Sequence, residues 1–288
     1  MTNLDQLPLT PGVHSVATTD ADGQQREFLV CVPTGPVKLI GVIFHPFDAS
    51  PELVVYGEEP GEYLITHLDG ILRPADAVGM LVIAPRARGR VLDRVSLAWR
   101  PHLDATWDLA VRARDETGAA AIITGGLSMG GLEALVFAGQ HADEIAAVWA
   151  VNPVVDIAAW YRDLVDRHPD GAPNEPTTRF EIAEELGGTP EDAADSYRVR
   201  SANSYASELS RTKVRITWSP HDTVIPNAAT AHAHPLAVDV RAHGGDVTEV
   251  ILTREPSDSS LDAGRVAHES CDVWENTGWA FASAVQPA

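Results

Sequence analysis

The sequence predicts an α/β protein with a mostly parallel, doubly wound sheet, that is, a sheet covered by helices on both faces. Apolar, β-branched runs of strand length alternate with segments of helical periodicity along most of the chain. Several of these runs are apolar throughout, as in strands that are buried on both faces. One of them, Ala119 to Thr124, passes through a glycine-rich turn into a helix-forming segment, Leu132 to Ala138.

Length and composition predict one domain over residues 1–288. The chain has 288 residues, of which 44% are hydrophobic and 22% charged, so it can bury a large core. This length suits a single α/β unit that carries an insertion.

Charge and patterning exclude two classes of partner. The net charge is -20, from 41 acidic and 21 basic residues, so the surface should repel nucleic acid and anionic lipid. The first residues have neither a basic start nor an apolar core, and no run reaches the ~20 apolar residues that span a bilayer. We therefore expect a cytoplasmic protein with no membrane partner, in which Cys31 and Cys271 are free, buried thiols.

The first half of the chain predicts a hairpin turn and then strands alternating with helices. The expected elements are a turn at residues 20–23, strands at 28–32, 39–44, 80–84 and 119–124, and helices at 58–77, 106–117 and 132–138. Three rounds of alternation indicate parallel strands with right-handed crossovers.

The second half repeats the alternation with one long interruption. Strands are expected at 146–151, 214–218 and 248–253, and helices at 228–241 and 274–284. Between the first two of these strands, residues 154–213 carry acidic helical pieces near 181–186 and 191–194. We interpret this stretch as a helical lid, an insertion that precedes the strand carrying the acid and shapes the pocket.

The turn Gly126-Leu127-Ser128-Met129-Gly130 predicts a nucleophile. A serine hydroxyl is a poor nucleophile, and a strained strand-to-helix turn pushes it within reach of a base. The glycines at 126 and 130 leave room where the chain reverses. The helix that follows turns its free N–H groups toward Ser128. The alternative is a glycine-rich turn that only packs.

An acyl-transfer enzyme also needs two N–H groups to hold the oxyanion. Met129, directly after the nucleophile, supplies one. The second is expected in the loop after the run 39–44, where His45-Pro46-Phe47 follows. Pro46 has no N–H, so Phe47 is the expected donor. The alternative is a plain loop after a strand.

An acid and a base follow in the order that such enzymes use. Asp222 comes directly after the run 214–218, from where it can fix the tautomer of a histidine. His268 is the histidine that follows the final strand-like run, on a predicted loop. Ser128, Asp222 and His268 thus form a candidate triad.

No metal or cofactor is expected. His232 and His234 diverge if they lie two apart on a helix, and no acidic cluster has the spacing of metal ligands. Trp99 and Trp160 are candidate walls of an apolar or aromatic substrate pocket, although aromatic residues are as often part of the core.

The chain resembles the α/β-hydrolase superfamily from about residue 26 onward. It is most similar to the branch of dienelactone hydrolases and prolyl-oligopeptidase-type serine hydrolases, on the segments 185–190, 197–201 and 222–226. The resemblance implies an α/β-hydrolase fold, Ser128 as nucleophile, Asp222 as acid, His268 as base, and oxyanion amides from Phe47 and Met129. The chain departs from that branch at three positions, with Pro46 in the oxyanion loop, Ala202 in place of proline and Ser219 in place of glycine.

Together these features predict a serine hydrolase acting on a small-molecule carboxylic ester through an acyl-enzyme intermediate. Two alternatives stay open: a small peptidase or amidase of the same fold, since a triad does not choose the leaving atom, and a hydrolase-fold binding protein without turnover. The sequence gives no prediction of the oligomeric state.

Overall fold

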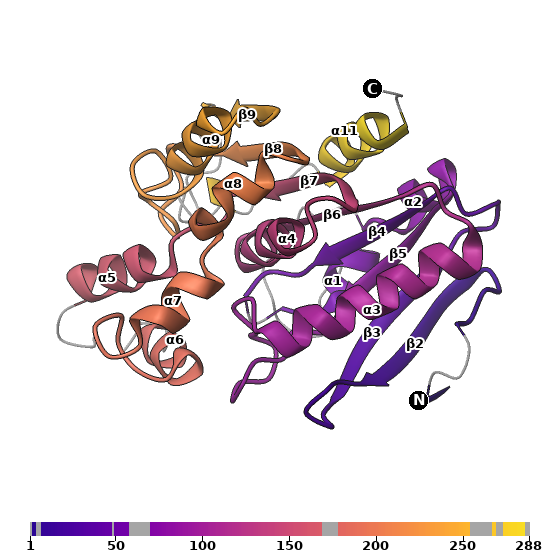
Figure 1. The fold of residues 1–288 in the computed structure, drawn as a ribbon, viewed down its shortest axis with the longest axis horizontal. Helices are drawn as coiled ribbons and strands as arrows, with labels where there is room; N and C mark the ends of the chain where they lie inside the picture. Colours follow the sequence, from indigo (N-terminus) through magenta and orange to yellow (C-terminus); the bar gives the residue numbers. More distant parts are fainter. Residues whose placement is uncertain are drawn as a thin grey trace, which may run out of the picture.

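A mostly parallel sheet organises the chain, as the sequence predicts, and the described residues form nine strands of it (Figure 1). The computed structural model describes residues 2–3, 7–47, 49–57, 70–168, 178–253, 267–268 and 273–285. The strands lie in the order β1-β2-β3-β5-β4-β6-β7-β8-β9. They are β1 (Thr2–Asn3), β2 (Gly12–Thr19), β3 (Gln25–Val32), β4 (Leu39–Phe44), β5 (Met80–Pro85), β6 (Ala121–Leu127), β7 (Ile145–Val151), β8 (Lys213–Trp218) and β9 (Val247–Ile251).

Strand direction divides the sheet into two parts. β2 pairs antiparallel with β3, and β3 pairs antiparallel with β5. From β5 through β4, β6, β7 and β8 to β9, every neighbouring pair is parallel. The carboxyl ends of β4, β6, β7 and β8 therefore meet at one edge, where ligands collect in such sheets.

Helices cover both faces of the sheet. They are α1 (Pro51–Tyr56), α2 (Leu72–Val78), α3 (Arg100–Thr117), α4 (Met129–Gln140), α5 (Ile157–Arg167), α6 (Thr178–Leu186), α7 (Ala194–Arg200), α8 (Ala206–Leu209), α9 (Ala233–Ala242) and α11 (Val273–Val285), with a 3-10 turn at Ala202–Tyr205. Helices α3, α4, α8 and α9 pack on one face, and α1, α2 and α11 on the other.

The burial of β4 shows the two-faced core directly. All six of its residues are buried, but Ile40 and Val42 join the cluster under α3 and α4, whereas Leu39 and Ile43 join the cluster under α1 and α11. A strand between two apolar layers needs apolar side chains in both directions, which explains the uninterrupted run.

The predicted hairpin turn joins β2 to β3. The Asp20 carboxylate accepts hydrogen bonds from the backbone N–H groups of Asp22 (3.0 Å) and Gln24 (2.8 Å). Gly23 has φ 76°, a left-handed conformation that glycine adopts without strain. Sequence reasoning found this turn but missed β2, because most residues of that strand are exposed or half-buried.

Several predicted boundaries were wrong. The helix expected at 106–117 begins six residues earlier, at Arg100, because Pro101 suits a first turn. The helix expected at 228–241 begins at Ala233, after a series of turns. Residues 191–193 are a turn, and the helix there begins at Ala194. Of the helix expected at 58–77, residues 58–69 lie outside the described residues and the last part is α2.

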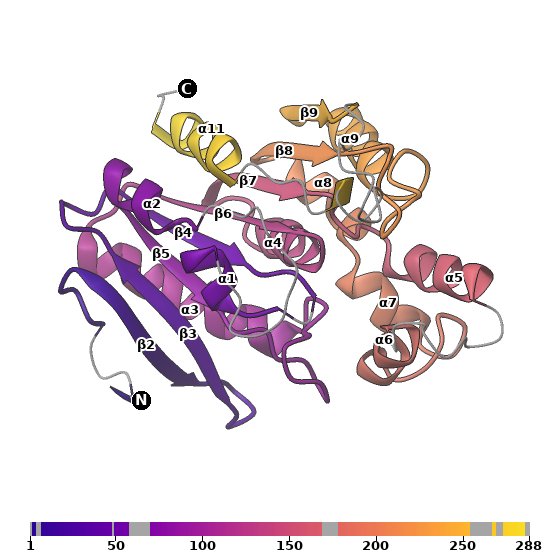
Figure 2. The same ribbon diagram turned by 180° about the vertical axis from the view of Figure 1, so that it is seen from behind.

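The insertion at residues 154–213 contains α5, α6, α7 and α8. Figures 1 and 2 both show α5, α6 and α7 grouped at the side of the molecule toward which β4 and β8 point. The insertion thus lies near the edge where the candidate site residues are expected. Its role as a lid stays a prediction.

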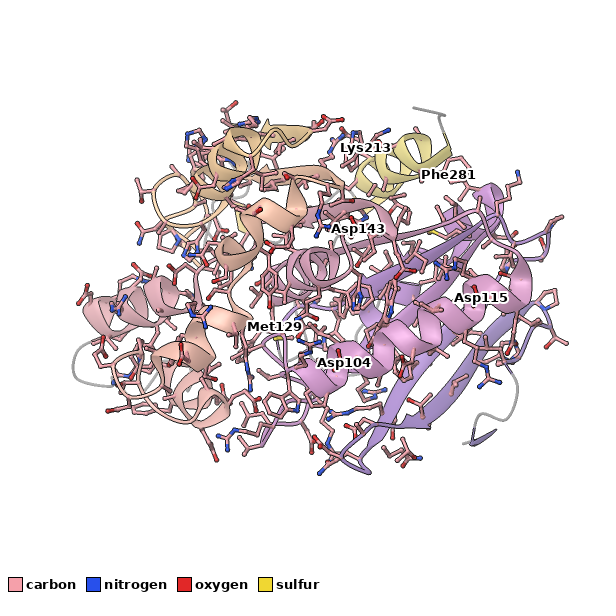
Figure 3. All side chains as sticks on the ribbon, viewed as in Figure 1. Asp104, Asp115, Met129, Asp143, Lys213 and Phe281 are labelled. Carbon is pink, nitrogen blue, oxygen red and sulfur yellow. The ribbon has the colours of Figure 1, made fainter. Side chains whose placement is uncertain are left out.

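Helix α11 packs on the face of the sheet that α1 and α2 also cover. The Lys213 side chain donates a hydrogen bond to the Ser283 carbonyl (2.9 Å), and Figure 3 labels Lys213 and Phe281 in this region.

Cys31 is a free, buried thiol whose pKa is raised to about 12 by burial. Cys271 lies outside the described residues. No helix among the described residues is long and apolar enough to cross a membrane.

Candidate active site

Ser128 stands on a strained turn between β6 and α4. It has φ 57° and ψ −118°, which a residue with a side chain rarely adopts and which costs on the order of 1–3 kcal/mol. Its N–H donates to the Val151 carbonyl of β7 (2.9 Å), and its carbonyl accepts from Leu132 N–H (3.1 Å). The turn is therefore held from both sides, with the serine at the amino end of α4.

The two glycines of the motif allow three backbone segments to meet. A Cβ at Gly126 would overlap the backbone of Gly130, and a Cβ at Gly130 would overlap the carbonyl oxygen of Phe44. The first turn of α4 thus packs directly on the chain leaving β4. Met129, labelled in Figure 3, is the first residue of this turn of α4, and Phe47 comes three residues after β4 ends.

Asp222 lies in the turn after β8 with its carboxylate buried. One oxygen, Oδ1, accepts hydrogen bonds from the N–H groups of Val224 (2.8 Å) and Ile225 (2.9 Å). The other, Oδ2, lies 2.7 Å from Nδ1 of His268. Two backbone donors and one ring donor fix the orientation of this carboxylate.

His268 is buried beside Asp222. Because a carboxylate only accepts, the His268 Nδ1 carries the proton of this hydrogen bond, and Nε2 is the ring nitrogen that does not bond to Asp222. Residues 267–268 have a helical backbone, where the sequence predicts a loop. The structure brings the predicted acid and base together from positions 46 residues apart.

The loop after β4 is held by His45. The His45 Nδ1 donates to the Pro46 carbonyl (2.8 Å), and Nε2 accepts from Ala87 N–H (2.9 Å). Burial lowers the pKa of His45 to about 4, so the ring is neutral and can both donate and accept. The ring joins the loop that carries Phe47 to the chain leaving β5.

The two candidate pocket residues lie in different surroundings. The ring of Trp160, on α5, meets Phe47 edge to face at 6.1 Å, and its indole Nε1 has no hydrogen-bond partner among the described residues. Trp99 lies under the Arg200 guanidinium, 4.4 Å from the ring centre. Trp160 is therefore close to the predicted oxyanion loop, whereas no described contact links Trp99 to that loop.

The loop before Trp99 makes a buried polar contact with α4. The Ser96 hydroxyl donates to the carboxyl group of Glu133 on α4, and burial raises the pKa of Glu133 to about 8. Burial therefore favours the protonated, uncharged form of Glu133. Leu97 and Ala98, between Ser96 and Trp99, both have positive φ, 45° and 56°.

Sequence reasoning missed Asn152. This buried residue directly follows β7, and its side chain bonds to the segments that carry Asp222 and His268. The sequence signal was a polar residue directly after the apolar run 146–151, which lies between the strands that precede Ser128 and Asp222.

No group of three or more His, Cys, Asp or Glu residues in the described part of the chain could hold a metal ion. His232 precedes α9 instead of lying on it, and its Nδ1 accepts from the N–H groups of Val155 (3.2 Å) and Asp156 (3.3 Å). Burial lowers its pKa to about 4. This ring therefore has a structural role.

Comparison with solved structures identifies the fold. The chain superposes on a Pyrobaculum calidifontis esterase with TM-score 0.62 and 15% identity, covering 95% of this chain and 86% of that one. A thermostable carboxyl esterase from Bacillus coagulans gives TM-score 0.58 and 12% identity, covering 94% and 100%. An acylaminoacyl peptidase from Pyrococcus horikoshii gives 0.61 and 14%, covering 89% of this chain and 39% of the peptidase.

These proteins share the α/β-hydrolase fold, and so does this chain. The chain spans about two fifths of the length of the peptidase. No family model matches the sequence, and no curated protein sequence matches it.

Proposed function

We propose that the protein is a serine hydrolase that cleaves a carboxylic ester. The observation that carries the proposal is the buried hydrogen bond between Asp222 and His268 (2.7 Å). Ser128 stands on its strained turn after β6 in the same sheet, and no hydrogen bond joins it to His268 among the described residues. A carboxylate that fixes an imidazole, together with a serine on a strained strand-to-helix turn, is the set of groups that acyl-transfer catalysis uses.

The proposed reaction has two halves. His268 Nε2 removes the proton of Ser128 Oγ, which attacks the acyl carbon, and the N–H groups of Met129 and Phe47 hold the oxyanion. The alcohol leaves with the proton from His268. A water molecule, activated by the same ring, then releases the acid from Ser128. Each oxyanion donor is worth about 3 kcal/mol of transition-state stabilisation.

An ester is the proposed substrate because an alcohol leaves more readily than an amine, and because Pro46 limits the N–H groups available in the oxyanion loop. The solved neighbours include both esterases and peptidases, among them a ferulic acid esterase and a puromycin hydrolase. Hydrolysis of an amide is therefore the competing proposal. The contact between Phe47 and Trp160 favours an apolar or aromatic group next to the acyl carbon.

The test compares the protein with its Ser128→Ala variant on esters and amides that share one acyl group. The wild type should hydrolyse the esters faster, and Ser128→Ala should abolish turnover while keeping a similar melting temperature. Faster cleavage of the amides would favour the peptidase alternative. Turnover that survives in Ser128→Ala would contradict the mechanism, and a folded wild type without turnover on a broad panel would favour a binding protein.

A further inference from the structure

Asn152 occupies a position between the strands of the proposed nucleophile and acid. It follows β7, which lies between β6 and β8 in the sheet. Its φ is 42°, in the left-handed region that asparagine adopts more readily than most other residues. Its side chain is buried, with 1% of the residue exposed.

The side-chain amide of Asn152 joins two separate segments. Its Oδ1 accepts a hydrogen bond from Ser219 N–H (2.9 Å), three residues before Asp222. Its Nδ2 donates to the carbonyl oxygens of Ala267 (3.1 Å) and His268 (2.8 Å). One planar group thus bonds the backbone that carries the acid and the backbone that carries the base.

The backbone around Asn152 also contacts the nucleophile. The Asn152 N–H donates to the Thr217 carbonyl of β8 (2.8 Å), and the carbonyl of Val151 accepts from Ser128 N–H (2.9 Å). Segments carrying all three proposed triad members therefore bond to two consecutive residues, Val151 and Asn152.

This arrangement restricts His268 at two points. The Asp222 carboxylate holds Nδ1 of the ring, and the Asn152 amide holds the backbone carbonyl of the same residue. A ring held only at Nδ1 can move with its backbone, whereas a ring held at both points keeps one direction for Nε2. Errors of about 1 Å in such groups cost on the order of 10²-fold in rate.

We propose that Asn152 is a positioning residue that fixes the backbone of His268 relative to Asp222 and Ser128. The inference rests on the proposed function, because it assigns His268 the role of base. Asn152 acts through the residues that it holds and takes no part in proton transfer. If the position of His268 did not depend on these three hydrogen bonds, they would contribute to stability alone.

Two substitutions separate the contacts. Asn152→Gly keeps the left-handed backbone and removes all three side-chain bonds. Asn152→Asp keeps an acceptor for Ser219 N–H but replaces the donor to the His268 segment with a second acceptor. Asn227→Ala is the matched control, since its half-buried amide donates to Asp163 Oδ1 on α5 (3.1 Å) and to no backbone atom of Ser219, Ala267 or His268 among the described contacts.

We expect both Asn152 variants to lower kcat by roughly 10²-fold while KM changes less than about twofold, and Asn227→Ala to retain both constants. Assays run well below each variant's melting temperature remove the effect of unfolding. Wild-type kcat in both variants would overturn the inference. A loss of kcat in Asn152→Gly but not in Asn152→Asp would also overturn the inference. It would show that kcat depends on the contact with Ser219, which Asn152→Asp keeps.

A second readout does not depend on turnover. The Nδ1 proton of His268, shared with a buried carboxylate, should give a low-field proton NMR resonance that disappears in Asp222→Asn. It should be sharp in the wild type and Asn227→Ala, and broadened or lost in both Asn152 variants at temperatures where they are folded. If Ser128→Ala retains turnover, the proposed function fails, and the resonance alone decides whether Asn152 positions His268. An unchanged resonance would overturn the inference in either case.

Discussion

Buried histidine rings show how single residues set the response of this protein to acid. His102 lies in the first turn of α3, beside Phe44, and neither of its ring nitrogens has a hydrogen-bond partner among the described residues. Burial lowers its pKa to about 3. In the unfolded chain a histidine titrates near 6.5, so acid favours the unfolded state between these two values.

The substitution His102→Leu tests how much this buried ring contributes to the pH dependence of stability. Removing the ring should reduce the slope of the unfolding free energy against pH, between about pH 6 and pH 4, by about 1.4 kcal/mol per pH unit. The variant should also be at least as stable as the wild type, because an unpaired buried polar group is removed. Urea unfolding curves at several pH values measure the slope. A slope equal to that of the wild type would show that His102 is already protonated in the folded protein.

At the residue scale, sequence reasoning found what the local chain chemistry encodes. The turn at Ser128 was predictable because it needs glycine at fixed positions, and the place of Asp222 after β8 was predictable from the apolar run 214–218. The catalytic roles of both residues stay predictions. The structure pairs Asp222 with His268. The role of Asn152 was not predictable, since it depends on bonds to segments 67 to 116 residues away.

Among the elements, α6 is fastened by a buried carboxylate. Glu185 accepts hydrogen bonds from the N–H groups of Arg90 (2.6 Å) and Val91 (2.9 Å), and it forms an ion pair with the Arg200 guanidinium (2.9 Å). Both charged side chains are nearly inaccessible to solvent, 0% and 4% exposed. The contact ties α6 and α7 of the insertion to the loop after β5.

The prediction for this element uses Glu185→Ala, with Glu184→Ala as the control. Removing Glu185 leaves the Arg200 charge buried and unpaired, which costs about 3–5 kcal/mol of stability. The side chain of Glu184 is exposed, so its loss should change stability by less than about 0.5 kcal/mol. Thermal and urea unfolding of both variants measure the difference. Equal stabilities would mean that water enters the contact and that α6 is not anchored there.

The hydrophobic runs predicted which strands and helices are present more reliably than they predicted where each one begins and ends. The strand at 39–44 was predicted with its observed bounds, because both of its faces are apolar. The starts of α3 and α9 were wrong, since Pro101 and the turns before Ala233 set them more than the apolar pattern does. The short helix α1 was missed because six residues give too little periodicity to detect.

At the scale of the molecule, a parallel sheet brings distant chain segments to one edge. The strand order β4-β6-β7-β8 places the chain after each strand beside the next, so residues near 45, 128, 152 and 222 become neighbours. Sequence reasoning predicted this edge from the alternation of strands and helices. It also placed the insertion 154–213 at this edge as a lid, and that role stays a prediction. How α6 and α7 are fastened could not be predicted, since it depends on tertiary contacts such as those of Glu185 with Arg90 and Arg200.

In the proposed mechanism, His268 is held by Asp222 and makes Ser128 a nucleophile. An activated phosphonate, which reacts with the hydroxyl of such a serine, tests it without knowledge of the natural substrate. Intact-protein mass spectrometry of the wild type should show one adduct, mapped to Ser128. His268→Ala should react roughly 10²- to 10⁴-fold more slowly. The absence of an adduct at Ser128 in the folded wild type, or equal labelling rates in His268→Ala, would contradict the account.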